Sequence, residues 1–201
     1  MKRGIFVTII FFILILIFFS IYYYIFQKNG NNIIIKDVNQ AESYISNIGN
    51  YRATVEVTVE SNKNSNIYNM KQVKENDYRL QEGIDGEIEG IIIENKEGKV
   101  IIKNTKLNLT KIYNDYSYMT DNCLFLDTFI KEWKESEDKK VIEEENNYKF
   151  EMKIKNQRNR YIQSKTLYLD KNTNEPASLE IKDVNRKRTI YILYKEIEIE
   201  R

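Results

Sequence analysis

The chain has 201 residues, which is enough for one folded domain with an appendage. Its 31 basic and 30 acidic residues nearly cancel to a net charge of +1, so no basic face indicates a nucleic-acid partner. The absence of histidine excludes His-based triads, histidine zinc sites and imidazole acid–base catalysis. A single cysteine, Cys123, excludes an intramolecular disulfide, so the domain must be held together by its own core.

The N-terminus carries an uncharged apolar run over residues 5–26. As a helix, this run would span about 33 Å, enough to cross a hydrocarbon core of about 30 Å. Lys2 and Arg3 precede it, and Tyr22–Tyr24 lie near its far end, as in an interfacial aromatic belt. We therefore expect a single-pass anchor in the cell membrane, with the rest of the chain outside the cytoplasm.

A cleaved signal peptide is the alternative interpretation of this run. The apolar region of a signal peptide usually has about 7–15 residues and ends at small residues, whereas this one is longer and ends at Ile25-Phe26-Gln27. The sequence thus favours an uncleaved anchor. It predicts an anchor over residues 1–27, a linker over 28–36 and one domain over 37–201.

The predicted domain opens with a helix followed by a strand. Asp37 is a suitable N-cap, apolar residues recur at helical spacing from Val38 to Ile48, and Gly49 is expected to end the helix. From Tyr51 to Glu60, apolar and polar residues then alternate strictly, which predicts a strand with one buried and one solvated face.

More strands and a second helix follow. Strands are predicted at residues 67–75 and 77–82, in a hairpin over 90–104 that turns at Lys96-Glu97-Gly98, and around Leu107 and Leu109. The stretch Tyr113–Thr120 lacks periodicity and is predicted to be a loop. A helix capped by Asp121 or Asn122 should then present one apolar stripe: Leu126, Phe129, Ile130 and Trp133.

The C-terminal third alternates again. Strands are predicted at residues 141–145 and 148–155, at 165–170, around Leu179 and Ile181, and from Ile190 to Ile199. The last strand shifts phase, and a β-bulge near Lys195-Glu196 would restore its inward direction. Because no helical crossovers separate these strands, the sequence predicts an α+β fold, a curved, mostly antiparallel sheet or half-barrel with helices on its concave side.

The C-terminal stretch over residues 165–199 carries a motif built largely from turns. It reads strand, turn, strand, turn, strand, and its motif positions are Leu169, Asp170, Thr173, Pro176, Leu179, Asp183 and Asn185. This pattern resembles the closing motif of the LolA-like lipoprotein-carrier superfamily. Within that superfamily, the chain is similar to clostridial proteins related to the germination lipoprotein GerS.

The resemblance implies a role outside the cytoplasmic membrane in sporulation or germination. It also implies a protein partner, which for GerS is a cortex-modifying amidase. The chain departs from a lipoprotein in one respect, because no cysteine follows the hydrophobic segment to accept a lipid.

Two groups of residues are candidate binding sites. The stripe Leu126, Phe129, Ile130 and Trp133 would either line an apolar pocket or fill the core, and helical aromatic stripes favour the core. A second group, Tyr113, Tyr116 and Tyr118, would either contact a partner or cover the open end of the sheet.

Other polar groups have simpler interpretations. Glu143, Glu144 and Glu145 could pair for metal binding or hydrolysis, but a solvated hairpin rim is favoured. Asp183 and Asn185 lack the rest of a calcium loop and indicate a turn. Cys123 near a helix start is expected to be an inert thiol.

The sequence therefore predicts a binding protein rather than an enzyme, with no cofactor or metal. The leading interpretation is a membrane-anchored partner or regulator protein in sporulation or germination. The alternative is a lipid or lipoprotein carrier or sensor that uses the concave face of the sheet.

Overall fold

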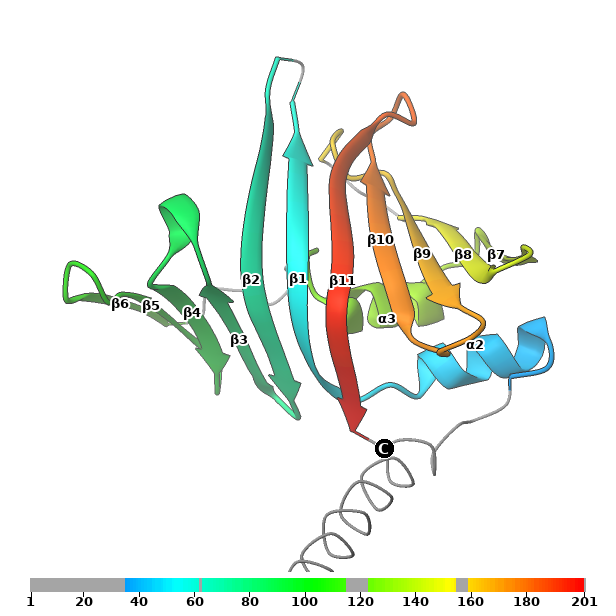
Figure 1. Cartoon of the computed structure of the whole chain (residues 1–201), viewed down its shortest axis with the longest axis horizontal. Coiled ribbons are helices and arrows are strands. Elements are labelled where there is room, and N and C mark those ends of the chain that lie inside the picture. Colours follow the sequence, from blue (N-terminus) through cyan, green and yellow to red (C-terminus); the bar gives the residue numbers. More distant parts are fainter. Residues whose placement is uncertain (1–34, 62, 115–122, 155–158, 201) are drawn as a thin grey trace, which may run out of the picture. The chain divides into compact units, whose positions relative to one another are not determined.

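The computed structural model describes residues 35–61, 63–114, 123–154 and 159–200 (Figure 1). The predicted membrane segment, residues 5–26, lies outside these ranges. Within them, no helix is both long enough and apolar enough to span a bilayer.

One antiparallel sheet accounts for most of the described domain. Its strands follow the spatial order β6-β5-β4-β3-β2-β1-β11-β10-β9-β8-β7. Their bounds are β1 (Asn50–Glu60), β2 (Ser65–Glu75), β3 (Tyr78–Gly83), β4 (Ile91–Lys96), β5 (Lys99–Asn104), β6 (Leu109–Asn114), β7 (Lys139–Glu143), β8 (Asn147–Lys153), β9 (Ser164–Asp170), β10 (Pro176–Lys182) and β11 (Arg188–Glu200).

Two α-helices lie on one face of this sheet (Figure 1). They are α2 (Val38–Ser46) and α3 (Leu126–Glu135), and a short 3-10 helix, η1 (Gly86–Ile88), joins β3 to β4. The large antiparallel sheet with helices on one side is the architecture that the sequence predicted.

The pairing of β1 with β11 joins the two halves of the sheet. Asn50 lies opposite Glu200, and Val59 lies opposite Ile190. Each strand has its other neighbour in its own half, because β1 also pairs with β2 and β11 with β10. The first and last strands of the domain are therefore its central strands (Figure 1).

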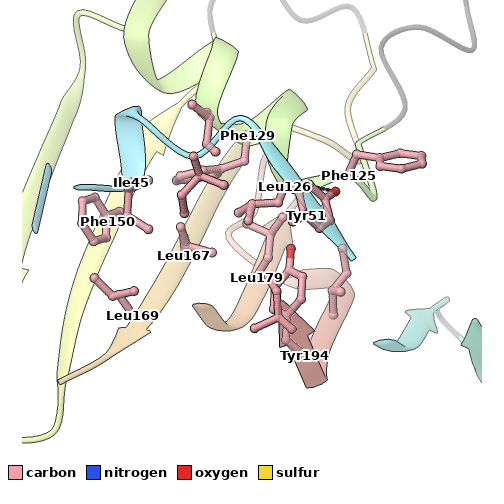
Figure 2. Packing of buried hydrophobic residues seen from close by; sticks show 14 of the residues in the cluster. Ile45, Tyr51, Phe125, Leu126, Phe129, Phe150, Leu167, Leu169, Leu179 and Tyr194 are labelled. Carbon is pink, nitrogen blue, oxygen red and sulfur yellow. Dashed lines mark hydrogen bonds between the residues drawn. The ribbon is translucent and has the colours of Figure 1, made fainter. Parts of the chain in front are cut away.

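Strict alternation in β1 decides which face the helices cover. Tyr51, Ala53, Val55 and Val57 are at most 6% exposed and belong to the core cluster, while the alternate residues point the other way. Figure 2 shows this cluster, in which residues of both helices pack against β1 and β8–β11.

The β-bulge predicted in the last strand is confirmed. Thr54 pairs with Glu196 and Val55 with Tyr194, so Lys195 is the extra residue, with no residue directly opposite it on β1. This extra residue restores the inward direction, and Ile197 is 9% exposed.

Helix α2 begins as predicted but ends earlier. Its N-cap is Asp37, whose carboxylate accepts from the Gln40 backbone N–H at 2.9 Å. The prediction that Gly49 ends the helix was wrong. Asn47 is the C-cap, and its side-chain amide donates to the Ser43 carbonyl at 2.9 Å, which satisfies a terminal carbonyl before Gly49 is reached.

The prediction of a loop beginning at Tyr113 was also wrong. Tyr113 lies opposite Val100 and Asn114 opposite Lys99, so both residues extend the edge strand β6. Because β6 is an edge strand, most of its residues are exposed, and this removes the alternation that marks a half-buried strand.

The turns of the C-terminal motif are held by aspartates. Asp170 accepts from the backbone N–H groups of Asn172 and Thr173, at 2.7 and 3.0 Å. Asp183 accepts from those of Asn185 and Lys187, both at 2.8 Å. These contacts confirm that Asp183 and Asn185 form a turn.

The register of β1 makes a prediction about stability. Val57→Lys should place an ammonium group in the core and lower the free energy of unfolding by several kcal/mol, since Val57 is 1% exposed. The matched variant Thr58→Lys, on the opposite face, should change it by less than about 0.5 kcal/mol. Urea denaturation of both variants provides the measurement, and equal losses would contradict the assigned faces.

Candidate functional site

The apolar stripe of α3 lies in the core. Leu126, Phe129, Ile130 and Trp133 are each at most 4% exposed. They belong to one cluster with residues of α2, β1 and β8–β11 (Figure 2). The structure therefore places the stripe where the sequence favoured it, inside the packing between helix and sheet.

Trp133 is enclosed from several sides. Its ring packs against Phe129 at 5.9 Å and against the edge of Phe150 at 5.3 Å, measured between ring centroids. Its indole N–H donates to the Glu42 carboxylate of α2 at 3.1 Å, and the Lys139 ammonium lies 5.2 Å from the ring. The space at this position is filled by side chains.

The N-terminus of α3 is capped from β1. The N-cap residue, Phe125, has no side chain that can accept a hydrogen bond. Instead, the Tyr51 hydroxyl accepts from the Leu126 backbone N–H at 2.9 Å, as the dashed line in Figure 2 shows. Burial raises the pKa of Tyr51 well above the ordinary tyrosine value, which keeps the hydroxyl neutral.

The predicted cap of this helix, Asp121 or Asn122, lies outside the described residues. The helix itself begins at Leu126, later than such a cap would require.

A largely buried ion pair holds the same end of α3 to β3. The Arg79 guanidinium donates to Oδ2 of Asp127 at 2.6 and 3.0 Å, and the side chains are 16% and 14% exposed. Arg79 also lies 5.4 Å from the centre of the Phe125 ring. Further along the helix, Glu132 lies 2.5 Å from the fully buried ammonium of Lys165 on β9. Polar contacts thus fix both ends of α3 on the sheet.

A hollow of about 420 Å³ lies where β1 ends and β11 begins. Its apolar lining comes from Val59, Ile190, Ile162 and Tyr161. Val59 is 37% exposed and Tyr161 58%, so apolar surface reaches solvent here. Since Asn50 lies at the other end of β1, the hollow is at the opposite end of the sheet from the point where the chain enters it (Figure 1).

Three connecting segments form the rim of the hollow. They are the end of β1 with the residue after it (residues 60–61), the stretch before β9 (residues 159–162), and the β10–β11 turn with the start of β11 (residues 183–189). The hollow has the size of a small ligand site, and its apolar residues suit an aliphatic or aromatic group. Charged residues also line it: Glu60, Asp183, Lys187 and Arg188.

The second predicted group is only partly described. Tyr113 is half-buried on β6, and the Lys111 ammonium lies 5.0 Å from its ring. Tyr116 and Tyr118 lie outside the described residues, so their predicted role at a partner surface stays a prediction.

The remaining candidates have ordinary surroundings. Glu143 is exposed and pairs with Lys171 at 2.8 Å, while Glu144 lies 3.8 Å from Lys149. Burial raises the pKa of the Cys123 thiol, which disfavours a reactive thiolate. In the part of the chain that the structure describes, no cluster of three acidic or cysteine side chains could hold a metal ion.

Two features were missed by the sequence reasoning. The cap of α3 comes from Tyr51, which lies far away in the sequence and which strand alternation alone marked as an inward residue. The hollow combines residues of three separate segments. Tyr161, in the unassigned stretch before β9, was its one available signal, an aromatic residue outside any predicted strand.

Comparisons with known proteins identify relatives of this fold. A family model described as "Sporulation protein YdcC-like" matches residues 2–201. No curated protein matches the chain.

Solved structures share the architecture. One is a chain of the CwlD amidase–GerS lipoprotein complex from Clostridioides difficile, with 24% identity and a TM-score of 0.53 over 83% of this chain and 98% of that one. An uncharacterized conserved protein from Thermus thermophilus shows 12% identity and a TM-score of 0.49, over 82% of this chain and 89% of that one. A LolA superfamily protein from Nitrosomonas europaea shows 8% identity and a TM-score of 0.40, over 83% of this chain and 95% of that one. The similarity to the chain from the GerS complex confirms the fold that the resemblance implied, and the family model confirms the relation to sporulation proteins.

The cap of α3 makes a prediction about stability. Tyr51→Phe removes the acceptor of the buried Leu126 N–H and should lower the free energy of unfolding by about 1–3 kcal/mol. Tyr191→Phe deletes the same oxygen on the half-buried opposite face of the sheet and should cost clearly less. Thermal unfolding of both variants decides the matter, and an equal or smaller loss for Tyr51→Phe would refute the cap.

Proposed function

Since the chain belongs to the sporulation protein YdcC-like family, we propose that it is a binding protein of sporulation or germination that acts by capturing a protein partner. The family supports a role in sporulation, and the fold supports action by binding. The partner, the membrane anchor and the absence of catalysis are further parts of the proposal.

The filled core under α3 carries the choice of a protein partner over a lipid. A carrier needs an open apolar space between helix and sheet, but Trp133 and Phe129 occupy that space and are 1% and 0% exposed. Polar contacts also hold α3 to the sheet at Asp127 and Glu132. Opening a cavity there would break these contacts, so the described domain is better suited to presenting a rigid surface.

An amidase is the partner that we propose. The neighbour with a TM-score of 0.53 comes from a complex of the CwlD amidase with the GerS lipoprotein, and this chain covers 98% of it. That complex supports a cortex-modifying amidase of the CwlD kind as the partner here. The domain itself would not be catalytic, because the chain has no histidine to act as a base or to bind zinc.

The proposed partner makes a binding prediction. The full chain in detergent micelles should bind the CwlD-type amidase of the same bacterium with a Kd of about 1 μM or tighter, measured by calorimetry. Purified alone, the chain should release no product from peptidoglycan. Absence of binding, together with one acyl lipid per chain by mass spectrometry, would replace this proposal with the carrier function.

The proposed anchor makes a separate prediction. The uncharged run over residues 5–26 should keep the full chain in the membrane fraction after a high-salt or carbonate wash, since the hydrophobic effect does not weaken with salt. A variant with Ile13→Lys and Ile15→Lys should become soluble. A mature N-terminus near residue 28 by N-terminal sequencing would show cleavage and contradict the anchor.

A further inference from the structure

Cationic side chains lie on and beside the segments that border the hollow. Lys187 and Arg188 line it, whereas Lys182 and Arg186 line a neighbouring hollow. Together, the stretches over residues 60–66, 159–163 and 182–189 carry six cations and two carboxylates, although the whole chain is nearly neutral at +1. The cations are Lys63, Arg160, Lys182, Arg186, Lys187 and Arg188, and the carboxylates are Glu60 and Asp183.

Both carboxylates on these segments already have partners. Glu60 receives the Arg188 guanidinium at 2.7 Å, and Asp183 accepts two backbone N–H groups of its own turn. Two of the six cations, Lys182 and Arg188, form ion pairs. The other four form none with the described residues: Lys63, Arg160, Arg186 and Lys187. The rim therefore has excess positive charge that is available to a ligand.

Hydrogen bonds hold these segments together. The Val184 N–H donates to the Arg160 carbonyl at 3.1 Å, and the Thr189 hydroxyl donates to the Tyr161 carbonyl at 2.8 Å. Across the sheet, Arg188 Nε donates to Glu60 at 2.8 Å. The cations and the apolar hollow thus form one preorganised surface, which lowers the entropic cost of binding.

Exposed apolar groups lie among these cations. Tyr161 is 58% exposed and Val184 59%, and Val59 opens into the hollow at 37%. An isolated apolar side chain at the surface is ordinary, but Val59 and Tyr161 line a cavity of about 420 Å³, and Val184 lies in the adjoining turn. The surface offers an apolar anchor site beside the cations of the β10–β11 turn.

The opposite end of the sheet carries charges of both signs. Glu75, Glu198 and Glu200 lie there with Arg52 and Lys74, and Arg52 pairs with Glu75 at 2.5 Å. That end therefore has no comparable excess of cations.

We propose that this basic rim and its hollow bind an acidic segment of the protein partner, with one apolar side chain of that segment inserted beside Tyr161. The inference rests on the proposed function and names the surface that would carry it. A protein segment is favoured because it supplies carboxylates and an aliphatic or aromatic side chain together. A single-stranded nucleic acid supplies phosphates and aromatic bases but no carboxylate, and the test includes it as the competing ligand.

The test uses the full chain in detergent micelles and the CwlD-type amidase of the same bacterium. The double variant Arg186→Glu, Lys187→Glu should weaken binding about tenfold or more and flatten the dependence of the association rate on salt. The matched control Lys96→Glu, Lys99→Glu makes the same charge change on the β4–β5 hairpin and should bind like the wild type. Tyr161→Ala should weaken binding with little change in thermal stability, because its side chain is largely exposed.

The outcomes separate the two claims. If the wild-type chain does not bind the amidase, the proposed function fails. If it binds and the rim variant binds equally well, or if the control loses as much affinity as the rim variant, the assignment of this surface is wrong. Tight binding of a single-stranded oligothymidine that the rim variant abolishes would assign the surface to nucleic acid and overturn the proposal.

Discussion

The position of α3 on the sheet depends on the hydrogen bond between the Tyr51 hydroxyl and the Leu126 N–H. This bond satisfies the first amide of a helix whose own N-cap, Phe125, cannot do so. The Arg79–Asp127 pair lies beside this bond and holds the same end of the helix to β3. With that end held, the apolar stripe of α3 faces the sheet, and Trp133 occupies the interior that a lipid would need.

Local patterns predicted the strands well because their physical causes are local. The alternation in β1, the bulge at Lys195 and the aspartate turn at Asp183 each follow from a few neighbouring residues. The edge strand at Tyr113 was missed because an exposed strand loses its alternation. The end of α2 was misplaced because Asn47, and not the glycine two residues later, satisfies the terminal carbonyls.

The candidate site was harder to predict because its parts are distant in sequence. The hollow joins Val59, Tyr161 and Ile190, which meet only after β1 and β11 have paired. The core role of Trp133 was accessible from helical spacing alone, since a stripe of that width indicates burial. Pairings such as Arg79 with Asp127 have no signature in a single sequence, because either residue could equally have been a solvated surface charge.

The central position of the first and last strands has a consequence for how the chain folds. The halves β2–β6 and β7–β10 consist of hairpins between neighbours, and these close short loops. The β1–β11 ladder closes the longest loop of the domain, so the core is complete only after Glu200 has been synthesised. Until then each half exposes a sheet edge that is open to aggregation. A truncation at the C-terminus would therefore remove strand pairing at the middle of the sheet, where the two halves are joined.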